Sequence, residues 1–292
     1  MNDDKRVIRP ASWQDGRSAE PDEATMYDEP RPEEAEDNAR HRRRGIYLLP
    51  NLFTTGGLFA GFYAIIAAMA GHYELASIAV FIAMLMDGLD GRVARLTHTE
   101  SAFGEQYDSI ADMVSFGLAP ALVMYQWALH GLNEYGWMWA KVGWLAAFVY
   151  AAAGGLRLAR FNARVHVVDK RYFQGLPIPS GAGLVAGGVW LGQSFGINGE
   201  SVMFPALVLT VCAGLLMVSS IPYYSFKGLN LRGRVPFTYI LVVPLIFIFI
   251  ALSPPKTLFG VFLAYSLSGP ILWLWRFYRR RRIARRLDER RD

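Results

Sequence analysis

Four aspartates occupy one short segment between two long apolar stretches. The segment reads DGLDGRVARLTHTESAFGEQYDSIAD over residues 87–112, with FIAMLM before it and MVSFGLAPALVMY after it. Asp87 and Asp90 are three residues apart and Asp108 and Asp112 are four apart, so each pair lies on one face of its own helix. If the two helices are antiparallel neighbours, the four carboxylates converge.

Such a convergence indicates a cation site, because clustered carboxylates repel each other strongly in a low dielectric unless protons or cations are present. Oxygen ligands select Mg²⁺, Mn²⁺ or Ca²⁺, which commonly share their coordination with substrate phosphates. Arg95 adds a planar cation suited to phosphate, Ser101 adds a hydroxyl donor, and Gly91 and Gly104 let a ligand approach the backbone. A solvated face of acids paired with arginines is the alternative. The apolar flanks disfavour it, since acids near a bilayer usually have a function.

The rest of the chain is typical of an all-α integral membrane protein. Of its 292 residues 53% are apolar, including 18 Phe and 8 Trp. A membrane-spanning helix needs about 20 mainly apolar residues. On that criterion we expect a bundle of about eight transmembrane helices, over residues 51–70, 74–94, 110–129, 137–159, 179–195, 202–219, 237–252 and 258–278.

The basic residues fall on alternate connections between these spans. An even number of spans with both termini and the aspartate segment on the cytoplasmic side of the inner membrane satisfies the positive-inside bias. Because the basic clusters flank spans, we expect them to contact membrane lipids and not nucleic acid, despite a net charge of +5. The clusters are Arg92 and Arg95; Arg157, Arg160, Arg164, Lys170 and Arg171; Lys227, Arg232 and Arg234; and the arginines of residues 276–291.

Three regions follow from this distribution. Residues 1–44 are expected to form a disordered acidic cytoplasmic tail that ends in a basic block, because their charge and scarcity of apolar residues prevent independent folding. Residues 45–278 form the transmembrane domain, and residues 279–292 form a basic cytoplasmic tail. No cleavable signal peptide is expected, so the first span stays as an anchor. The single cysteine, Cys212, excludes an intrachain disulfide and a thiolate zinc site.

The aspartate segment is similar to the pattern D-x-x-D-G-x-x-A-R-x8-G-x3-D-x3-D of the CDP-alcohol phosphotransferases, integral membrane enzymes of phospholipid synthesis. The resemblance implies transfer of a phosphatidyl group from a CDP-linked lipid to an alcohol, with release of CMP. It also implies two divalent cations, Mg²⁺ or Mn²⁺, with Ca²⁺ as an alternative occupant. The matching positions are Asp87, Asp90, Gly91, Ala94, Arg95, Gly104, Asp108 and Asp112.

The same resemblance implies a role for each site residue. Asp87, Asp90 and Asp108 are expected to bind metal. Asp112 is expected to bind the second metal and to take the proton of the attacking alcohol. The CDP-lipid contacts are expected from a Pro-Asn-x-x-Thr segment at the first span and from the aspartate segment, namely Asn51, Thr54, Gly91, Arg95, Ser101 and Gly104.

Residues 154–164 and 173–183, together with NLFTTGGLFAGFYAI at the first span, resemble segments typical of membrane-spanning phosphatidylserine synthases. This resemblance implies CDP-diacylglycerol as donor, L-serine as acceptor and a homodimer. A serine carboxylate needs a cation such as Arg157 or Arg160, its ammonium group needs an acceptor such as Asn162, and its hydroxyl must face the base.

Three other interpretations stay open. The acceptor could be glycerol 3-phosphate, inositol phosphate or choline, although an acceptor with a phosphate would need a second dense basic cluster near Asp112. A cation or proton transporter would need polar groups deep within several spans, and the spans outside the aspartate segment are nearly uncharged. A scaffold whose acidic tail recruits partners predicts that Asp108→Asn or Asp112→Asn leaves function intact.

Overall fold

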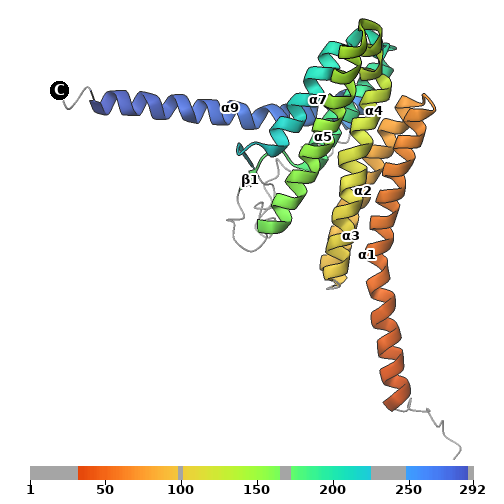
Figure 1. Ribbon diagram of the computed structural model, residues 1–292. Helices are drawn as coiled ribbons and strands as arrows, with labels where there is room; N and C mark the ends of the chain where they lie inside the picture. The colour runs from red at the N-terminus through yellow and green to blue at the C-terminus, as the bar shows by residue number, and fades with distance from the viewer. Residues whose placement is uncertain (1–31, 98–100, 165–171, 225–247, 289–292) are drawn as a thin grey trace, which may run out of the picture. The chain divides into compact units, whose positions relative to one another are not determined.

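The computed structural model describes residues 32–97, 101–164, 172–224 and 248–288, with the backbone alone described over residues 32–50 and over most of the chain after residue 275. These residues are helical almost throughout, which confirms the all-α fold class (Figure 1). The elements are α1 (Pro32–Met69), α2 (Tyr73–Thr97), α3 (Ala102–Asp112), the π-helical η1 (Met113–Leu118), α4 (Ala119–Trp127), the 3₁₀ turn η2 (Leu129–Tyr135), α5 (Trp137–Arg164), β1 (Tyr172–Gln174), α6 (Ile178–Ser194), the 3₁₀ turn η3 (Gly199–Val202), α7 (Met203–Val218), β2 (Pro222–Tyr224) and α9 (Pro254–Asp288).

The chain divides into two compact units, residues 1–43 and 44–292. In the first unit the described residues, 32–43, are helical, so the part of the expected tail after residue 31 is not extended chain. Proline is well tolerated at the first position of a helix, and Glu and Arg, which dominate the sequence there, are good helix formers. Residues 1–31 lie outside the described part of the chain. The domain boundaries stay a prediction.

In the second unit the helices pack into a bundle. Helix α5 packs against α7, and α6 packs against both α9 and α2. Helix α4 contacts both α5 and α6. Small residues allow close approach. A Cβ atom built at Gly214 would lie 3.1 Å from the Cα atom of Tyr150, and one at Gly187 would lie 3.4 Å from the Cα atom of Phe259. The strands β1 and β2 pair antiparallel, with Phe173 opposite Tyr223.

Four helical segments are long and apolar enough to cross a membrane, namely Asn51–Met69, Trp137–Ala163, Gly199–Val218 and Pro254–Trp275. They correspond to the first, fourth, sixth and eighth expected spans. Large apolar side chains such as Phe59, Phe148 and Ile271 are exposed on them, as expected for surfaces that face lipid.

The other four expected spans differ from this simple pattern. The second coincides with α2, which carries carboxylates and arginines, the third is divided among α3, η1 and α4, and the fifth is α6, with 17 residues. The seventh, residues 237–252, lies outside the described residues except for a helical turn over 248–252. A total of eight spans therefore stays a prediction.

The π-helical segment η1 begins directly after Asp112 and packs against both α1 and α5. Ser115 donates a buried hydrogen bond from its Oγ to the carbonyl oxygen of Gly57 at 3.1 Å. The buried hydroxyl of Tyr150 donates to the carbonyl oxygen of Phe116, also at 3.1 Å. A Cβ atom at Gly61 would lie 2.7 Å from the Cα atom of Ser115, so α1 touches η1 there without an intervening side chain. These contacts hold the C-terminal end of α3 in place.

Candidate active site

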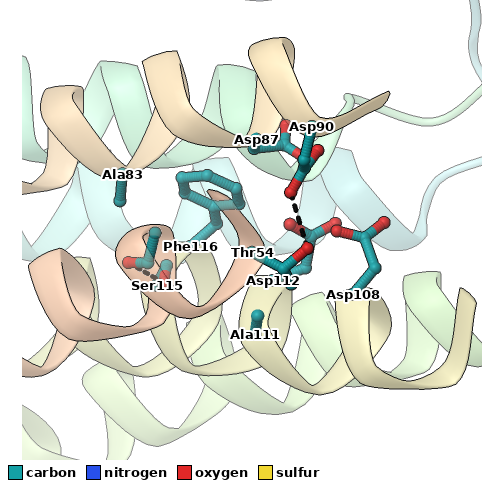
Figure 2. A pocket seen from close by; sticks show the side chains of 10 residues that line it. Thr54, Ala83, Asp87, Asp90, Asp108, Ala111, Asp112, Ser115 and Phe116 are labelled. Carbon is teal, nitrogen blue, oxygen red and sulfur yellow. Dashed lines mark hydrogen bonds between the residues drawn. The ribbon is translucent and has the colours of Figure 1, made fainter. Parts of the chain in front are cut away.

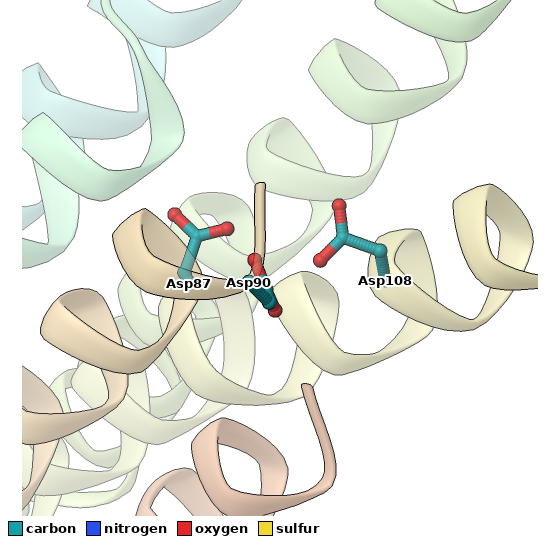
Figure 3. Close-up of side chains that lie close together, drawn as sticks. All are labelled: Asp87, Asp90 and Asp108. Carbon is teal, nitrogen blue, oxygen red and sulfur yellow. The ribbon is translucent and has the colours of Figure 1, made fainter. Parts of the chain in front are cut away.

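The four aspartates converge between the C-terminal half of α2 and the C-terminal half of α3. One carboxylate oxygen from each of Asp87, Asp90 and Asp108 lies within 4.8 Å of the other two (Figure 3). Asp112, one helical turn after Asp108, lines the same pocket (Figure 2) and interacts electrostatically with the other three carboxylates. The convergence expected from the spacing is therefore present in the structure.

The pocket is open on one side, has about 180 Å³ of space counted out into the solvent, and is lined in part by apolar side chains. Ala111 and Phe116 are buried beneath the carboxylates, and Ala83 and Gly57 close the wall formed by α2 and α1. An apolar lining lowers the local dielectric, which strengthens both the repulsion among the acids and their attraction for a cation. A cation placed among these carboxylates would therefore be attracted more strongly than at a fully solvated cluster.

The repulsion among the acids and their burial act on Asp108. Burial and the neighbouring charges of Asp90 and Glu105 raise the pKa of its carboxyl group to about 6. Desolvation disfavours the charged carboxylate, and like charges add to that penalty. Without a cation this group therefore takes up a proton close to neutral pH. A bound divalent ion would instead favour the charged form of the carboxylate.

The three converging oxygens fit a divalent metal ion. Oxygen ligands lie about 2.0–2.6 Å from Mg²⁺ or Ca²⁺, so two ligands of one ion are up to about 4–5 Å apart. The separation among the oxygens of Asp87, Asp90 and Asp108 is within that limit. Within the described ranges, this is the one group of three potential ligands that meets it. The chain can therefore hold a divalent cation at this position.

Thr54 reaches the cluster from α1. Its hydroxyl donates to Oδ2 of Asp90 at 2.9 Å in a buried hydrogen bond, drawn as the dashed line between the two residues in Figure 2. A hydrogen bond to one oxygen of a metal-binding carboxylate orients the other oxygen toward the ion. Thr54, expected as a contact of the CDP-lipid, is thus engaged with a carboxylate of the cluster.

The other expected CDP-lipid contacts lie around the two helix ends. Ser101 caps the N-terminus of α3, since its Oγ accepts from the backbone N–H of Gly104 at 3.0 Å. Asn51 is close by, because a Cβ atom at Gly104 would lie 3.5 Å from its Oδ1. On α2, a Cβ atom at Gly91 would meet open space, and Arg95 is exposed, with its Nε donating to the carbonyl oxygen of Gly91 at 2.7 Å.

The three expected serine contacts on α5 have different neighbours in the structure. Arg160 is engaged in structural contacts, since Nη2 donates to Oε1 of Gln174 at 2.8 Å and Nη1 donates to the carbonyl oxygen of Val218 at 3.2 Å. Asn162 donates from Nδ2 to Oγ of Ser109 at 3.0 Å. Arg157 is different. Its buried Nε has no hydrogen-bond partner among the described residues, and its guanidinium interacts electrostatically with Asp112 and Tyr265.

Several residues at the site were not anticipated from the sequence. Ser115 and Phe116 line the pocket from the π-helical segment, and Tyr265 of α9 lies near Arg157. No spacing rule marks such residues, because they are brought to the site by a change of helix type and by a distant helix. Spacing alone could not choose between Arg157 and Arg160, since both are arginines on one helix; the sequence interpretation placed Arg160 before Arg157 as a serine ligand, and that assignment stays a prediction.

Comparison with known proteins agrees with this geometry. Residues 47–221 match the family model described as CDP-alcohol phosphatidyltransferase. A CDP-diacylglycerol–serine O-phosphatidyltransferase of Helicobacter pylori is 36% identical over 234 residues, which are 79% of this chain and 92% of that protein. One of Mycobacterium leprae is 30% identical over 237 residues, covering 79% and 76%. An archaetidylserine synthase of Methanothermobacter thermautotrophicus is 33% identical over 184 residues, covering 62% and 72%.

Proposed function

The chain belongs to the CDP-alcohol phosphatidyltransferase family, and we propose that it transfers the phosphatidyl group of CDP-diacylglycerol to L-serine, giving phosphatidylserine and CMP. The observation that carries this proposal is the convergence of Asp87, Asp90 and Asp108 beside Asp112 in one pocket of a multi-pass membrane protein. The names of the relatives, which cover most of this chain, support serine as the acceptor.

The donor lipid would be held at the aspartate cluster. Two divalent cations, Mg²⁺ or Mn²⁺ with Ca²⁺ as an alternative occupant, would neutralise the diphosphate and the departing CMP. Asp87, Asp90, Asp108 and Asp112 would be their ligands. The open backbone at Gly91 and the exposed Arg95 suit a bulky anionic group. Asn51, Ser101 and Gly104, which lie close together at the N-terminus of α3, would contribute further contacts, and Thr54 would act by orienting Asp90.

In the reaction, the hydroxyl oxygen of serine attacks the phosphorus that bears the diacylglycerol. The bond between this phosphorus and the oxygen bridging to CMP breaks, and CMP leaves with the electron pair. Asp112 takes the hydroxyl proton as the new bond forms. Asp112 lines the same pocket one turn beyond Asp108, and a phosphate held by the cluster would lie within its reach.

Serine would be oriented from α5. The buried Nε of Arg157 lacks a partner among the described residues, and the guanidinium interacts with Asp112, so it suits the carboxylate of an acceptor whose hydroxyl faces that base. Arg160 would support this wall through its bonds to Gln174 and Val218. Asn162 would offer its Oδ1 to the ammonium group of serine while its Nδ2 bonds Ser109.

We also propose that the protein is a homodimer of the inner membrane, with both termini and the active site on the cytoplasmic side. The alternation of basic connections supports this orientation.

The experiment uses the purified full-length protein with CDP-diacylglycerol, Mn²⁺ or Mg²⁺, and each of four radiolabelled alcohols: L-serine, glycerol 3-phosphate, inositol phosphate and choline. We expect label in lipid with serine alone, with one CMP released per lipid formed, and no turnover after chelation of the metal. Product with another alcohol and none with serine would change the acceptor. No lipid product with any of them would contradict the transferase, and a metal flux in sealed vesicles would then favour transport.

A further inference from the structure

The two residues that flank Asp108 along α3 are each hydrogen-bonded to a different helix. The hydroxyl of Tyr107 lies 2.9 Å from Oγ1 of Thr55 on α1. Oγ of Ser109 lies 3.0 Å from Nδ2 of Asn162 on α5. Successive residues of an α-helix point about 100° apart around its axis. The two bonds therefore attach α3 to its surroundings on either side of the direction in which Asp108 points.

The direction of each bond follows from the remaining contacts. Thr55 already donates its hydroxyl proton to the carbonyl oxygen of Asn51 at 2.7 Å, so Tyr107 is the donor to Thr55. Ser109 already donates to the carbonyl oxygen of Glu105 at 3.0 Å, so it accepts from Asn162. Each bond has one defined donor, and neither can reverse without breaking a second contact.

On α1, the residue before Thr55 is the one that binds Asp90. Thr54 and Thr55 are consecutive, and their hydroxyls contact α2 and α3 respectively. This one turn of α1 therefore bridges the two helices that carry the carboxylates. The separation between Asp90 and Asp108 depends on that bridge, while the repulsion between the two carboxylates acts to widen it.

We propose that Tyr107 and Ser109 are positioning residues, whose bonds to Thr55 and Asn162 fix the rotation of α3 so that Asp108 faces Asp87 and Asp90. Side-chain ends lie roughly 5–6 Å from a helix axis, so a rotation of about 10° moves a carboxylate by about 1 Å. Such a displacement is enough to spoil a metal site. The inference rests on the proposed function only in taking Asp108 as a metal ligand.

The effect should appear in metal affinity more than in folding. The Tyr107 bond is exposed, and a single exposed hydrogen bond contributes little to stability. Contacts that orient metal ligands, in contrast, change metal affinity by about 10-fold to 100-fold when they are removed. If these bonds served folding alone, their removal would lower the unfolding temperature and leave metal affinity unchanged.

The test is Mn²⁺ binding to the full-length protein in detergent, measured by the electron paramagnetic resonance signal of free Mn²⁺. We expect Tyr107→Phe, Thr55→Val and Ser109→Ala each to raise the dissociation constant about 10-fold. Thr55→Val should add nothing to Tyr107→Phe, because the two changes remove one bond. In the Tyr107→Phe and Ser109→Ala double variant the two increases in the dissociation constant should multiply, because the two changes remove two separate hydrogen bonds.

Two controls match these changes. Thr55→Ser keeps a hydroxyl at the same place and should retain the affinity of the wild type. Ser194→Ala removes a hydroxyl that donates to the carbonyl oxygen of Leu191, at the end of α6, and should leave Mn²⁺ binding unchanged. Thermal unfolding without metal reports the stability of every variant.

Unchanged Mn²⁺ affinity in folded Tyr107→Phe and Ser109→Ala proteins would overturn the inference, as would a lowered unfolding temperature with unchanged affinity. Failure of the wild type to bind Mn²⁺ would overturn it as well. If the variants weaken Mn²⁺ binding but the wild type transfers no phosphatidyl group to any alcohol, the positioning role holds and the proposed function fails.

Discussion

Among the four aspartates, Asp112 has different neighbours. It interacts with the other three carboxylates and also with Arg157, and it stands at the junction between α3 and the π-helical segment. Asp112→Asn keeps the size of the side chain and removes its ability to take a proton. We expect turnover to fall by about 10²-fold to 10⁴-fold, the usual contribution of a general base, while the protein stays folded.

The measurement is the initial rate of labelled serine incorporation at saturating substrates, beside thermal unfolding of the same sample. Full activity in the folded Asp112→Asn variant would show that another group takes the proton.

The two arginines of α5 offer a direct comparison of roles. Arg157→Lys replaces a planar two-pronged donor by a point charge, so we expect the KM for serine to rise about tenfold or more with little change in the KM for CDP-diacylglycerol. Arg160→Lys should mainly lower the unfolding temperature, because its bonds hold Gln174 and Val218. A larger effect on serine KM at Arg160 than at Arg157 would reverse the assignment.

Asp108 gives the site a pH dependence. Its pKa in the folded protein is raised from 3.8 to about 6, so between these values the folded state binds more protons than the unfolded state. The free energy of unfolding of the metal-free protein should therefore fall as pH rises from about 4 to about 6. Mn²⁺ competes with the proton, so its affinity should fall as pH drops below about 6.

Both trends can be followed in one titration series, with unfolding temperature measured from pH 4.5 to pH 7.5 with and without Mn²⁺. The stabilisation by Mn²⁺ should be largest at the upper end of the range. Stabilisation that is equal at every pH would show that Asp108 does not bind the ion.

At the scale of elements, the contact between α1 and η1 decides where the pocket floor lies. Gly61 has no room for a Cβ atom, since the backbone of Ser115 is in the way. Gly61→Ala should push the two helices apart, weaken the Ser115 to Gly57 bond and cost about 1–3 kcal/mol of stability.

Gly56→Ala on the same helix is the matched control. The nearest atom to a Cβ there is the flexible Sδ of Met86 at 3.8 Å, so this variant should unfold at or slightly above the temperature of the wild type. Thermal unfolding in detergent compares the two. Equal stability of both variants would mean that α1 and η1 can separate freely.

The elements also show what the sequence could and could not predict. The spacing of Asp108 and Asp112 sufficed to place both on one helical face, because that periodicity is local. The π-helical turn after Asp112 could not be anticipated, since it depends on contacts of Ser115 and Tyr150 with distant helices. The same holds for the bonds of Arg160, whose partners lie on β1 and α7.

At the scale of the whole molecule, the four apolar helices do not by themselves determine the orientation in the membrane. The third expected span, residues 110–129, is the critical one, because it begins in the last turn of α3, which contains Asp112, and continues through η1 and α4. As a helix, the 20 residues of this range have a length of roughly 30 Å, which matches a hydrocarbon core of about 30 Å. If it does cross, the exposed Leu96 and the exposed Glu134 lie on opposite sides of the membrane.

Single-cysteine labelling tests that arrangement. In a Cys212→Ala background, Glu134→Cys should react with a membrane-impermeant maleimide in intact cells, and Leu96→Cys should react only after permeabilisation. The physical reason is that arginines lie close to Leu96 and none lies close to Glu134, which predicts a cytoplasmic position for Leu96 by the positive-inside bias. Labelling of Leu96→Cys in intact cells would show that the orientation in the membrane is the reverse of the predicted one. Labelling of both from one side would show that α3, η1 and α4 enter the membrane without crossing it, and the aspartate pocket would then lie on a re-entrant segment.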